Sequence, residues 1–250
     1  MKNIKKKTAP DGVDFYFPDR EHLDGFVSSV LEGHEYPVLY WKLVDVKVVV
    51  DIGAHVGAAL RHFVKLFPNA KYFAYEPNPR AFELLKRNTE HINAKNLWLN
   101  RCALGAFDEE MKLYMGMHSS MQASLLPNEE NVDDGVVIPV KEAGSEIDKT
   151  CGGNIDLLKL DTEGMELPIL RSLDARLKQV KYLFVEYHSD SDRVELEKMM
   201  LKSHSLYCAS VFEPHRGTLC YISRGELERS RLEGKIKNYA FPKPRYEEIV

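Results

Sequence analysis

The chain has few cysteines and no apolar stretch long enough to cross a membrane. No apolar run approaches the ~20 residues that span a bilayer, and none follows the basic N-terminus, so the sequence predicts neither a transmembrane helix nor a signal peptide. The cysteines are too sparse for a disulfide scaffold and lack the CxxC spacing of a zinc site; they are Cys102, Cys151, Cys208 and Cys220. We therefore expect a cytoplasmic protein with reduced thiols and no membrane contact.

Positive charge is also in deficit. A formal net charge of −4 gives no positive field to attract nucleic acid, which disfavours a nucleic-acid substrate. The two most basic stretches, KNIKKK and KIKNYAFPKPR, lie near the ends and are interpreted as solvated termini or as contacts for an acidic partner. What remains is a chain of 250 residues, 44 % hydrophobic and 29 % charged, which suits one large globular domain with an extension.

Strands and helices alternate through most of the chain. Apolar runs, several ending in an acid, predict strands over 46–53, 71–77, 96–104, 155–161 and 182–188. Helical spacing predicts helices over 58–67, from Asn78 onward and over 190–203. This alternation indicates an α/β fold, in which a mostly parallel sheet carries helices on both faces. A closing antiparallel strand pair is predicted over 206–214 and 217–224.

The beginning of the chain is less regular. Residues 13–17 predict a short strand, and Asp19 begins a predicted helix that runs to Leu31. We therefore divide the chain into an N-terminal extension or cap, residues 1–45, and a main domain over residues 46–250.

The stretch VVVDIGAHVG, residues 48–57, combines a buried strand with a glycine turn and the start of a helix. Ligands of parallel sheets bind at the carboxyl ends of strands, where Asp51 would accept hydrogen bonds from an ammonium group or from turn amides. Gly53 permits a positive φ, and Gly57 permits close packing or a ligand against the backbone. The alternative is an ordinary turn in which Asp51 caps the helix.

A second acid ends the next strand. Glu76 lies 23 residues after Gly53, a distance typical of an acid that accepts both hydroxyls of a ribose. A dinucleotide pyrophosphate requires G-x-G-x-x-G, but His55 stands where the middle glycine would be. We therefore favour S-adenosyl-L-methionine, which has no phosphate, and keep a nicotinamide-dependent oxidoreductase as the alternative.

Several motifs occur in a fixed order between about residues 46 and 190: VVVDIGAHVG, YEPNPRAFELLKRN, RCALG, IDLLKLDTEGMELPIL and FVEYH. Together they resemble the FkbM family of S-adenosyl-L-methionine-dependent methyltransferases, with LDTEGMEL the most specific segment. The resemblance implies a Rossmann-like class I methyltransferase fold with a mostly parallel twisted sheet, and S-adenosyl-L-homocysteine as a product. The family usually has Asn where this chain has His55.

The resemblance also implies a cofactor site. The methionine end of the cofactor would contact the glycine turn, at Asp51, Gly53, Ala54, His55 and Gly57. The ribose and the edge of the adenine pocket would be formed by Glu76, Pro77 and Asn78. The adenine would be flanked at the end of the third strand by Asn100, Ala103 and Leu104. Asp161, at the end of the fourth strand, would lie near the sulfonium.

Methyl transfer to a hydroxyl needs alignment and a base that takes the proton. The segments LDTEG and VEYH supply the candidates Asp161, Glu163, Glu186 and His188. We predict that Asp161 or His188 is the base and that Glu163 and Glu186 hold the acceptor. In the alternative interpretation, Glu163 and Glu166 occupy the first turn of the next helix and complement its dipole. Three carboxylates would also suit a divalent metal, which we do not favour.

The predicted acceptor is a hydroxyl of a sugar, a glycan or a small-molecule metabolite. The loop 117–124 would either contact a polyhydroxylated acceptor or be ordinary surface, and Tyr36, Tyr40 and Trp41 would either stack on a sugar or fill the N-terminal core. A non-catalytic module that binds S-adenosyl-L-methionine is a further alternative, which the intact acids Asp51, Glu76 and Asp161 disfavour. The sequence predicts no oligomeric state.

Overall fold

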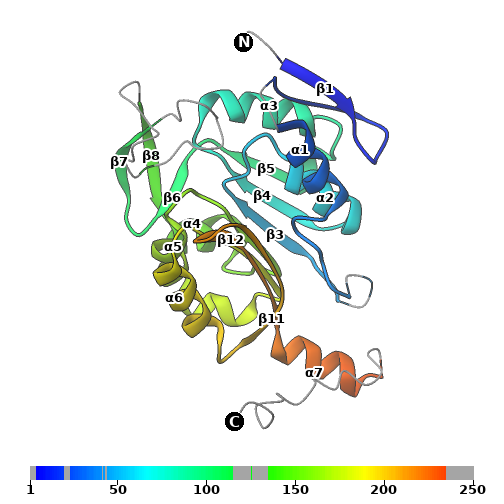
Figure 1. Ribbon diagram of the computed structural model, residues 1–250, viewed down its shortest axis with the longest axis vertical. Coiled ribbons are helices and arrows are strands. Elements are labelled where there is room, and N and C mark those ends of the chain that lie inside the picture. Colours follow the sequence, from blue (N-terminus) through cyan, green and yellow to red (C-terminus); the bar gives the residue numbers. More distant parts are fainter. Residues whose placement is uncertain are drawn as a thin grey trace.

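The computed structural model describes residues 4–19, 23–40, 42, 44–114, 125 and 135–234. Its centre is a seven-stranded sheet in the order β11-β12-β10-β9-β3-β4-β5 (Figure 1). The five strands that run parallel are β3 (Val48–Ile52), β4 (Lys71–Tyr75), β5 (Leu97–Asn100), β9 (Leu157–Leu160) and β10 (Tyr182–Tyr187). The predicted α/β class and the mostly parallel sheet are confirmed.

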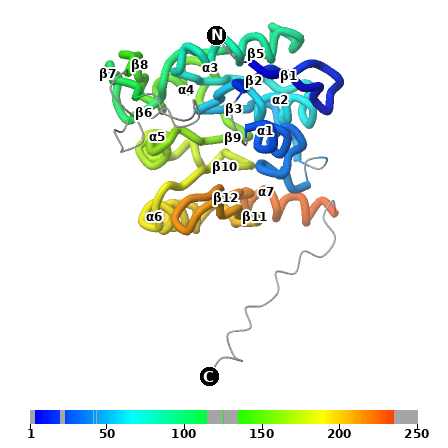
Figure 2. Tube along the Cα trace, turned by 45° about the horizontal axis from the view of Figure 1, so that its top comes forward, coloured from blue at the N-terminus to red at the C-terminus, as the bar shows by residue number. Residues whose placement is uncertain are grey.

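The other end of the sheet is antiparallel. Strand β12 (Arg216–Ser223) pairs antiparallel with β10 and also with β11 (His204–Glu213), so β11 again runs in the direction of β10. Figure 2 shows this pair at the opposite end of the molecule from β5. The predicted closing pair is confirmed, and its hairpin turn lies at the carboxyl edge of the parallel strands.

Helices cover both faces of the sheet, because the strands are apolar on both sides. One face packs against α1 (Leu23–Glu32), α2 (Ala58–Leu66) and α3 (Pro79–Thr89). The opposite face packs against α4 (Ala143–Cys151), α5 (Glu166–Leu173) and α6 (Asp190–Met200). The described residues also form α7 (Arg224–Leu232) and the short 3₁₀ segments Ala94–Asn96 and Asp174–Gln179. Within the described part of the chain, no helix has the length and apolar character needed to cross a membrane.

The predicted third strand, 96–104, is in fact two strands in different sheets. β5 ends at Asn100, where its partner β4 ends, and the Asn100 carbonyl accepts the Glu76 amide as the chain leaves the sheet. The continuation forms β6 (Ala103–Gly105) in a separate sheet with β8 (Val136–Glu142) and β7 (Glu109–Leu113). The polar residues Asn100 and Arg101 interrupt the predicted run at the point where the pairing of β5 with β4 ends.

The N-terminal segment differs from its prediction in the structure of its basic stretch. The basic stretch expected as a solvated terminus forms β1 (Ile4–Thr8), which pairs with β2 (Asp14–Pro18). The carboxylate of Asp19 forms an ion pair with Lys5 at 2.6 Å, and α1 is described only from Leu23. Phe15, Phe17 and the apolar face of α1 then pack against α2 and α3. The C-terminal basic stretch, Trp41 and the loop 117–124 lie outside the described residues.

Candidate active site

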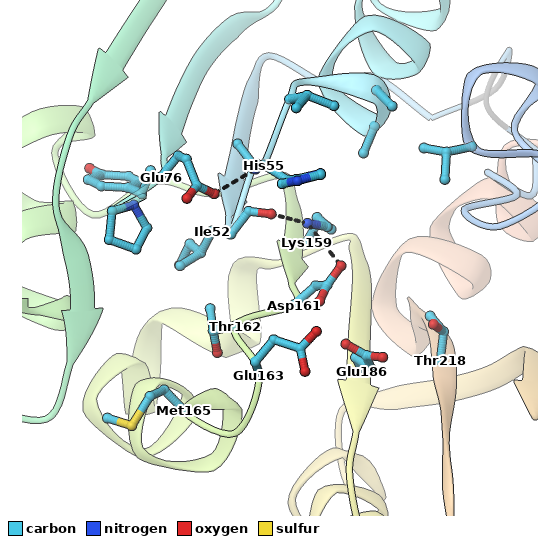
Figure 3. Close-up of a pocket in the computed structure, with 18 of the residues that line it drawn as sticks. Ile52, His55, Glu76, Lys159, Asp161, Thr162, Glu163, Met165, Glu186 and Thr218 are labelled. Atoms are coloured by element: carbon cyan, nitrogen blue, oxygen red, sulfur yellow. Dashed lines mark hydrogen bonds and ion pairs between the residues drawn. The ribbon is translucent and has the colours of Figure 1, made fainter. Parts of the chain in front are cut away.

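A cavity of about 430 Å³ opens at the carboxyl ends of β3, β4, β9 and β10 (Figure 3). One end is lined by the glycine turn after β3, by Glu76 and Pro77 after β4, and by β6. The other end is lined by the turn after β9, the end of β10, the β11–β12 hairpin and the N-terminal segment. We call these the cofactor end and the acceptor end, after the roles that the sequence analysis predicts for their residues.

The glycine turn is shaped by close backbone contacts. Gly53 has a φ of 80°, and a Cβ there would lie 1.7 Å from the Asp161 carbonyl oxygen, so the position requires glycine. The amides of Gly53 and Ala54 both donate to the Tyr75 carbonyl at 3.0 Å. His55 also has a positive φ, 48°, a conformation that Asn and His tolerate better than most residues. This backbone requirement explains how His can stand where the family usually has Asn.

Glu76 is the polar centre of the cofactor end. Its carboxylate accepts the backbone amide of His55 at 2.7 Å and that of Asn78 at 2.8 Å, and only 6 % of the residue is exposed. Burial raises the pKa of Glu76 to about 7, although the two amides oppose the shift. The carboxylate is therefore oriented by the backbone before any ligand arrives.

Four predicted cofactor residues are not among those that line the cavity, and one of them, Asp51, is described with Lys159 below. Gly57 has a φ of 88°, and a Cβ there would lie 2.7 Å from Leu85, so this glycine permits the packing of α2 against α3. Asn78 caps α3 by accepting the amides of Arg80 and Ala81. Asn100 donates its side-chain amide to the Ala74 carbonyl. Gly57, Asn78 and Asn100 therefore stabilise the elements that carry the cavity-lining residues without lining the cavity themselves.

The predicted adenine contacts come from a different element than expected. Ala103 and Leu104 line the cavity from β6, not from the end of a third strand of the main sheet, because the chain crosses to the small sheet at this point. Cys102 and Met165 lie on the same apolar wall.

Lys159 is the residue that the sequence analysis missed. It is the Cα partner of Asp51 in the β3–β9 pair, and its Nζ lies 3.3 Å from the Asp51 carboxylate and 3.4 Å from that of Asp161. Lys159 lines the cavity, whereas Asp51 is fully buried behind it and does not. The available signal was a lysine inside the apolar run IDLLKLD, two residues before Asp161 and thus on the same face of the strand.

The structure brings the four predicted catalytic residues together at the acceptor end, and Figure 3 shows Asp161, Glu163 and Glu186 turned toward one another. Arg216, at the start of β12, donates to Glu163 at 2.9 Å and to Glu186 at 2.8 Å. His188 lies 3.5 Å from the Glu186 carboxylate and 3.9 Å from that of Glu163. It is not among the residues that line the cavity, so it supports these carboxylates from behind.

The turn after β9 determines where Glu163 lies. Glu166, the first residue of α5, accepts the amide of Thr162 at 2.7 Å and that of Gly164 at 3.0 Å. Glu163 precedes the helix and has a positive φ of 58°, an uncommon conformation for a non-glycine residue that often occurs at functional sites. The alternative placing Glu163 in the first helical turn is therefore wrong, whereas Glu166 does occupy that turn.

The acceptor-end carboxyl groups differ in proton affinity. Burial raises the pKa of Glu163 to about 7 against the opposing charge of Arg216. Burial and then the charge of Asp161 raise the pKa of Glu186 well above its ordinary value. Burial alone would raise the pKa of Asp161, but Lys159 and its other partners lower it. One end of the cavity thus holds an ionised carboxylate, Asp161, together with Glu163, whose pKa is about 7, and Glu186, whose pKa is also raised.

A metal would need the same carboxylates that Arg216 now holds. Ligand atoms of Glu163, Glu186 and His188 lie within 4.8 Å of one another. The Arg216 guanidinium already bridges both glutamates and supplies the positive charge that they require. The cluster as arranged does not fit a metal ion, and we assign none to it.

Residues remote in sequence complete the acceptor end. Glu35 and Tyr36 come from the N-terminal segment, and Thr218 comes from β12. The Tyr36 hydroxyl donates to Asp161 at 3.2 Å, and the Thr218 hydroxyl donates to Glu35 at 3.3 Å. Tyr36 also packs against Phe63 and Phe184, so it fills the core as well as contacting Asp161. No local motif marked Glu35, Arg216 or Thr218.

Comparison with known proteins agrees with the geometry. Residues 51–207 match the methyltransferase FkbM domain. Methyltransferase 1 of Beauveria bassiana is 27 % identical over 148 residues, covering 52 % of this chain and 59 % of that protein. The hexuronic acid methyltransferase AglP of Haloferax volcanii is 26 % identical over 164 residues, covering 61 % of each chain. The 2-O-methyltransferase NoeI of Sinorhizobium fredii is 22 % identical over 192 residues, covering 70 % of this chain and 77 % of that protein.

The chain thus spans less than two thirds of the first two of these relatives, 59 % and 61 % of their lengths. The domain match, by contrast, covers more than half of this chain and includes the glycine turn, Glu76 and the LDTEG turn. The protein belongs to the FkbM methyltransferase family.

Proposed function

We propose that the protein transfers a methyl group from S-adenosyl-L-methionine to a hydroxyl oxygen of a sugar, glycan or small-molecule acceptor. The observation that carries the proposal is one continuous cavity with Glu76, oriented by two backbone amides, at one end and a carboxylate cluster at the other. The FkbM domain match supports the same reaction class over the nicotinamide alternative.

The cofactor end suits an adenosine joined to an amino acid. The carboxylate of Glu76 would accept the two ribose hydroxyls while it keeps its backbone amides, because each carboxylate oxygen has two acceptor positions. Ala103 and Leu104 would cover the adenine, and the turn from Gly53 to His55 would lie along the methionine part. When bound, the cofactor supplies a methyl group on a sulfonium, which is a strong electrophile without further activation.

The acceptor end suits a hydroxyl that must lose its proton. Glu163 combines a place on the cavity wall with a pKa of about 7, which supports it as the base, since a general base works best near the operating pH. Asp161, with its lowered pKa, is a weak base and a good hydrogen-bond acceptor for the hydroxyl. His188 would stabilise the charge of Glu163 and Glu186 from behind. The predicted roles of Asp161 and His188 as the base thus become supporting roles in this proposal.

Two relatives support an oxygen atom of a carbohydrate as the acceptor. NoeI is a 2-O-methyltransferase and AglP a hexuronic acid methyltransferase. The acceptor end of this cavity offers several carboxyl groups that can accept hydrogen bonds from hydroxyl groups, which suits a polyhydroxylated molecule.

The N-terminal segment would act as a cap over the acceptor. Phe26, Val27 and Val30 of α1 line the cavity together with Glu35 and Tyr36. We therefore propose that the division at residue 45 is functional. Residues 1–45 would contribute to the choice of acceptor, and residues 46–250 would hold the cofactor.

Calorimetric titration with S-adenosyl-L-methionine, S-adenosyl-L-homocysteine and NADH tests the cofactor, and release of S-adenosyl-L-homocysteine over a panel of sugars and hydroxylated metabolites tests the reaction. We expect micromolar binding of the first two ligands and none of NADH. Absence of binding by both adenosyl ligands at high micromolar concentration would overturn the proposal. Binding without turnover on any acceptor would instead favour a non-catalytic binding module.

A further inference from the structure

Asp51 lies where the cofactor's ammonium partner was predicted, yet it does not reach the cavity. Its side chain is 0 % exposed, and Lys159 stands between it and the cavity. The two residues are direct Cα partners on β3 and β9, so the pairing follows from the sheet register. A buried carboxylate requires a nearby cation, and Lys159 supplies one within the protein.

The Lys159 ammonium has three oxygen neighbours, which matches its three N–H groups. It donates to the Gly53 carbonyl at 2.6 Å and lies 3.3 Å from the Asp51 carboxylate and 3.4 Å from that of Asp161. It also lies 5.8 Å from the centre of the Tyr36 ring. Burial opposes its charge, but the two carboxylates outweigh burial and raise the pKa of Lys159. The ammonium is therefore fully engaged.

A second ammonium cannot take the same place. An amino group brought to Asp51 would have to approach the Lys159 ammonium, and like charges at such distances repel each other strongly in a buried site. Asp161 offers an alternative, since it lines the cavity and its side chain is 27 % exposed, whereas the side chain of Asp51 is 0 % exposed. Figure 3 shows the Asp161 carboxylate between Lys159 and the acceptor-end glutamates.

We propose that Lys159 is a positioning residue, an internal counter-ion that balances the charge of Asp51 through an ion pair and leaves Asp161 as the carboxylate that accepts the amino group of the bound cofactor. The inference rests on the proposed function, because it concerns the amino-acid part of S-adenosyl-L-methionine. It changes the role of Asp51 from ligand contact to partner of Lys159.

The first test compares S-adenosyl-L-homocysteine with its analogue lacking the amino group. In the wild type, loss of one charge-assisted hydrogen bond should weaken binding about 10- to 100-fold. Asp161→Asn should reduce this penalty to about threefold or less, whereas Asp51→Asn should keep it above about tenfold. The reverse order would overturn the inference. Failure of the wild type to bind either ligand would instead overturn the proposed function.

The second test needs no cofactor. Lys159→Met should lower Tm by about 5 °C or more, because it leaves buried charge uncompensated. Lys159→Met with Asp51→Asn should recover at least half of that loss, whereas the control Lys71→Met, on the exposed start of β4, should change Tm by less than about 1 °C. If the two substitutions lower Tm additively, Lys159 is not the counter-ion of Asp51, and the inference fails even where the cofactor binds.

Discussion

The two ends of the cavity are built in different ways. The cofactor end comes from two strand-to-helix connections that are close in sequence, Gly53 to His55 and Glu76 to Asn78, and backbone amides set its geometry. The acceptor end joins side chains that are far apart in sequence, and the hydrogen bond between Thr218 and Glu35 spans 183 positions. The cofactor end is therefore constrained by the fold itself, whereas the acceptor end can change through single side chains.

The largest expected effect breaks the cofactor end alone. Glu76→Ala should weaken S-adenosyl-L-homocysteine binding about 100-fold or more, because it removes two ribose hydrogen bonds to an ion and leaves two amides unpaired. Calorimetry measures this change. The matched control is Glu83→Ala, which removes the exposed ion-pair partner of Lys86 on α3. This variant should leave the affinity for S-adenosyl-L-homocysteine unchanged. A loss below about threefold would show that Glu76 does not hold the ribose.

At the acceptor end, Arg216→Met should separate catalysis from cofactor binding. It leaves Glu163 and Glu186 without their shared cation, so we expect kcat to fall about 10- to 100-fold while the affinity for S-adenosyl-L-homocysteine changes less than about threefold. The matched control is Arg224→Met. Arg224 follows the other end of β12 and donates to Ser205, so its loss should leave both kcat and cofactor affinity unchanged. Equal losses in binding and in kcat would mean that the two ends are not independent.

Acidity should weaken cofactor binding through Glu76. Glu76 has a pKa of about 7 when folded against an ordinary value of 4.5, so the folded protein holds a proton there between these pH values and binding of the ribose must release it. Affinity for S-adenosyl-L-homocysteine should therefore rise about tenfold from pH 6 to pH 8. Because the folded state binds this proton more tightly than the unfolded chain, the free energy of unfolding of the unliganded protein falls as pH rises from about 4.5 to about 7.

Glu76→Gln provides the control for this pH effect. The variant has no titrating group at the position, so its affinity should be weaker and nearly independent of pH over the same range. A slope that persists in Glu76→Gln would assign the titration to another group.

The smallest expected effect sharpens the acceptor end. Glu35→Gln keeps the shape of the buried side chain but removes its charge, so the KM for the acceptor should rise about three- to tenfold with cofactor affinity unchanged. Steady-state kinetics with the best acceptor of the panel measures it, and Glu32→Gln on the exposed end of α1 is the control. An unchanged acceptor KM would remove Glu35 from the acceptor site.

The sequence allowed the parallel sheet, the glycine turn and Glu76 to be predicted because each depends on local pattern. Strand periodicity identifies β3, β4, β9 and β10 wherever they pack, and the glycine at position 53 follows from a backbone that leaves no room for a Cβ. Ala103 and Leu104 line the cavity, but they do so from β6, and the polar residues Asn100 and Arg101 inside the run 96–104 did not by themselves specify a change of sheet.

The remaining site residues depend on register and topology. Asp51 and Lys159 meet only because β3 and β9 pair with these two residues opposite each other, which no single segment reveals. Glu35 and Arg216 lie on irregular or antiparallel segments whose placement against the parallel sheet is a tertiary outcome. A buried lysine within an apolar strand is nevertheless a usable signal, since such a residue must have an acidic partner nearby.

The insertion of β12 between β10 and β11 has a consequence for how the protein could be re-engineered. Because β11 runs with the parallel strands and β12 returns against them, the turn between Glu213 and Arg216 lies at the edge where the cavity opens (Figure 1). Under the proposed function, exchanging this short turn for that of a relative would change the side chains at the acceptor end and leave the glycine turn and Glu76 in place. On the same proposal, the hairpin is a replaceable module for choosing which hydroxyl is modified.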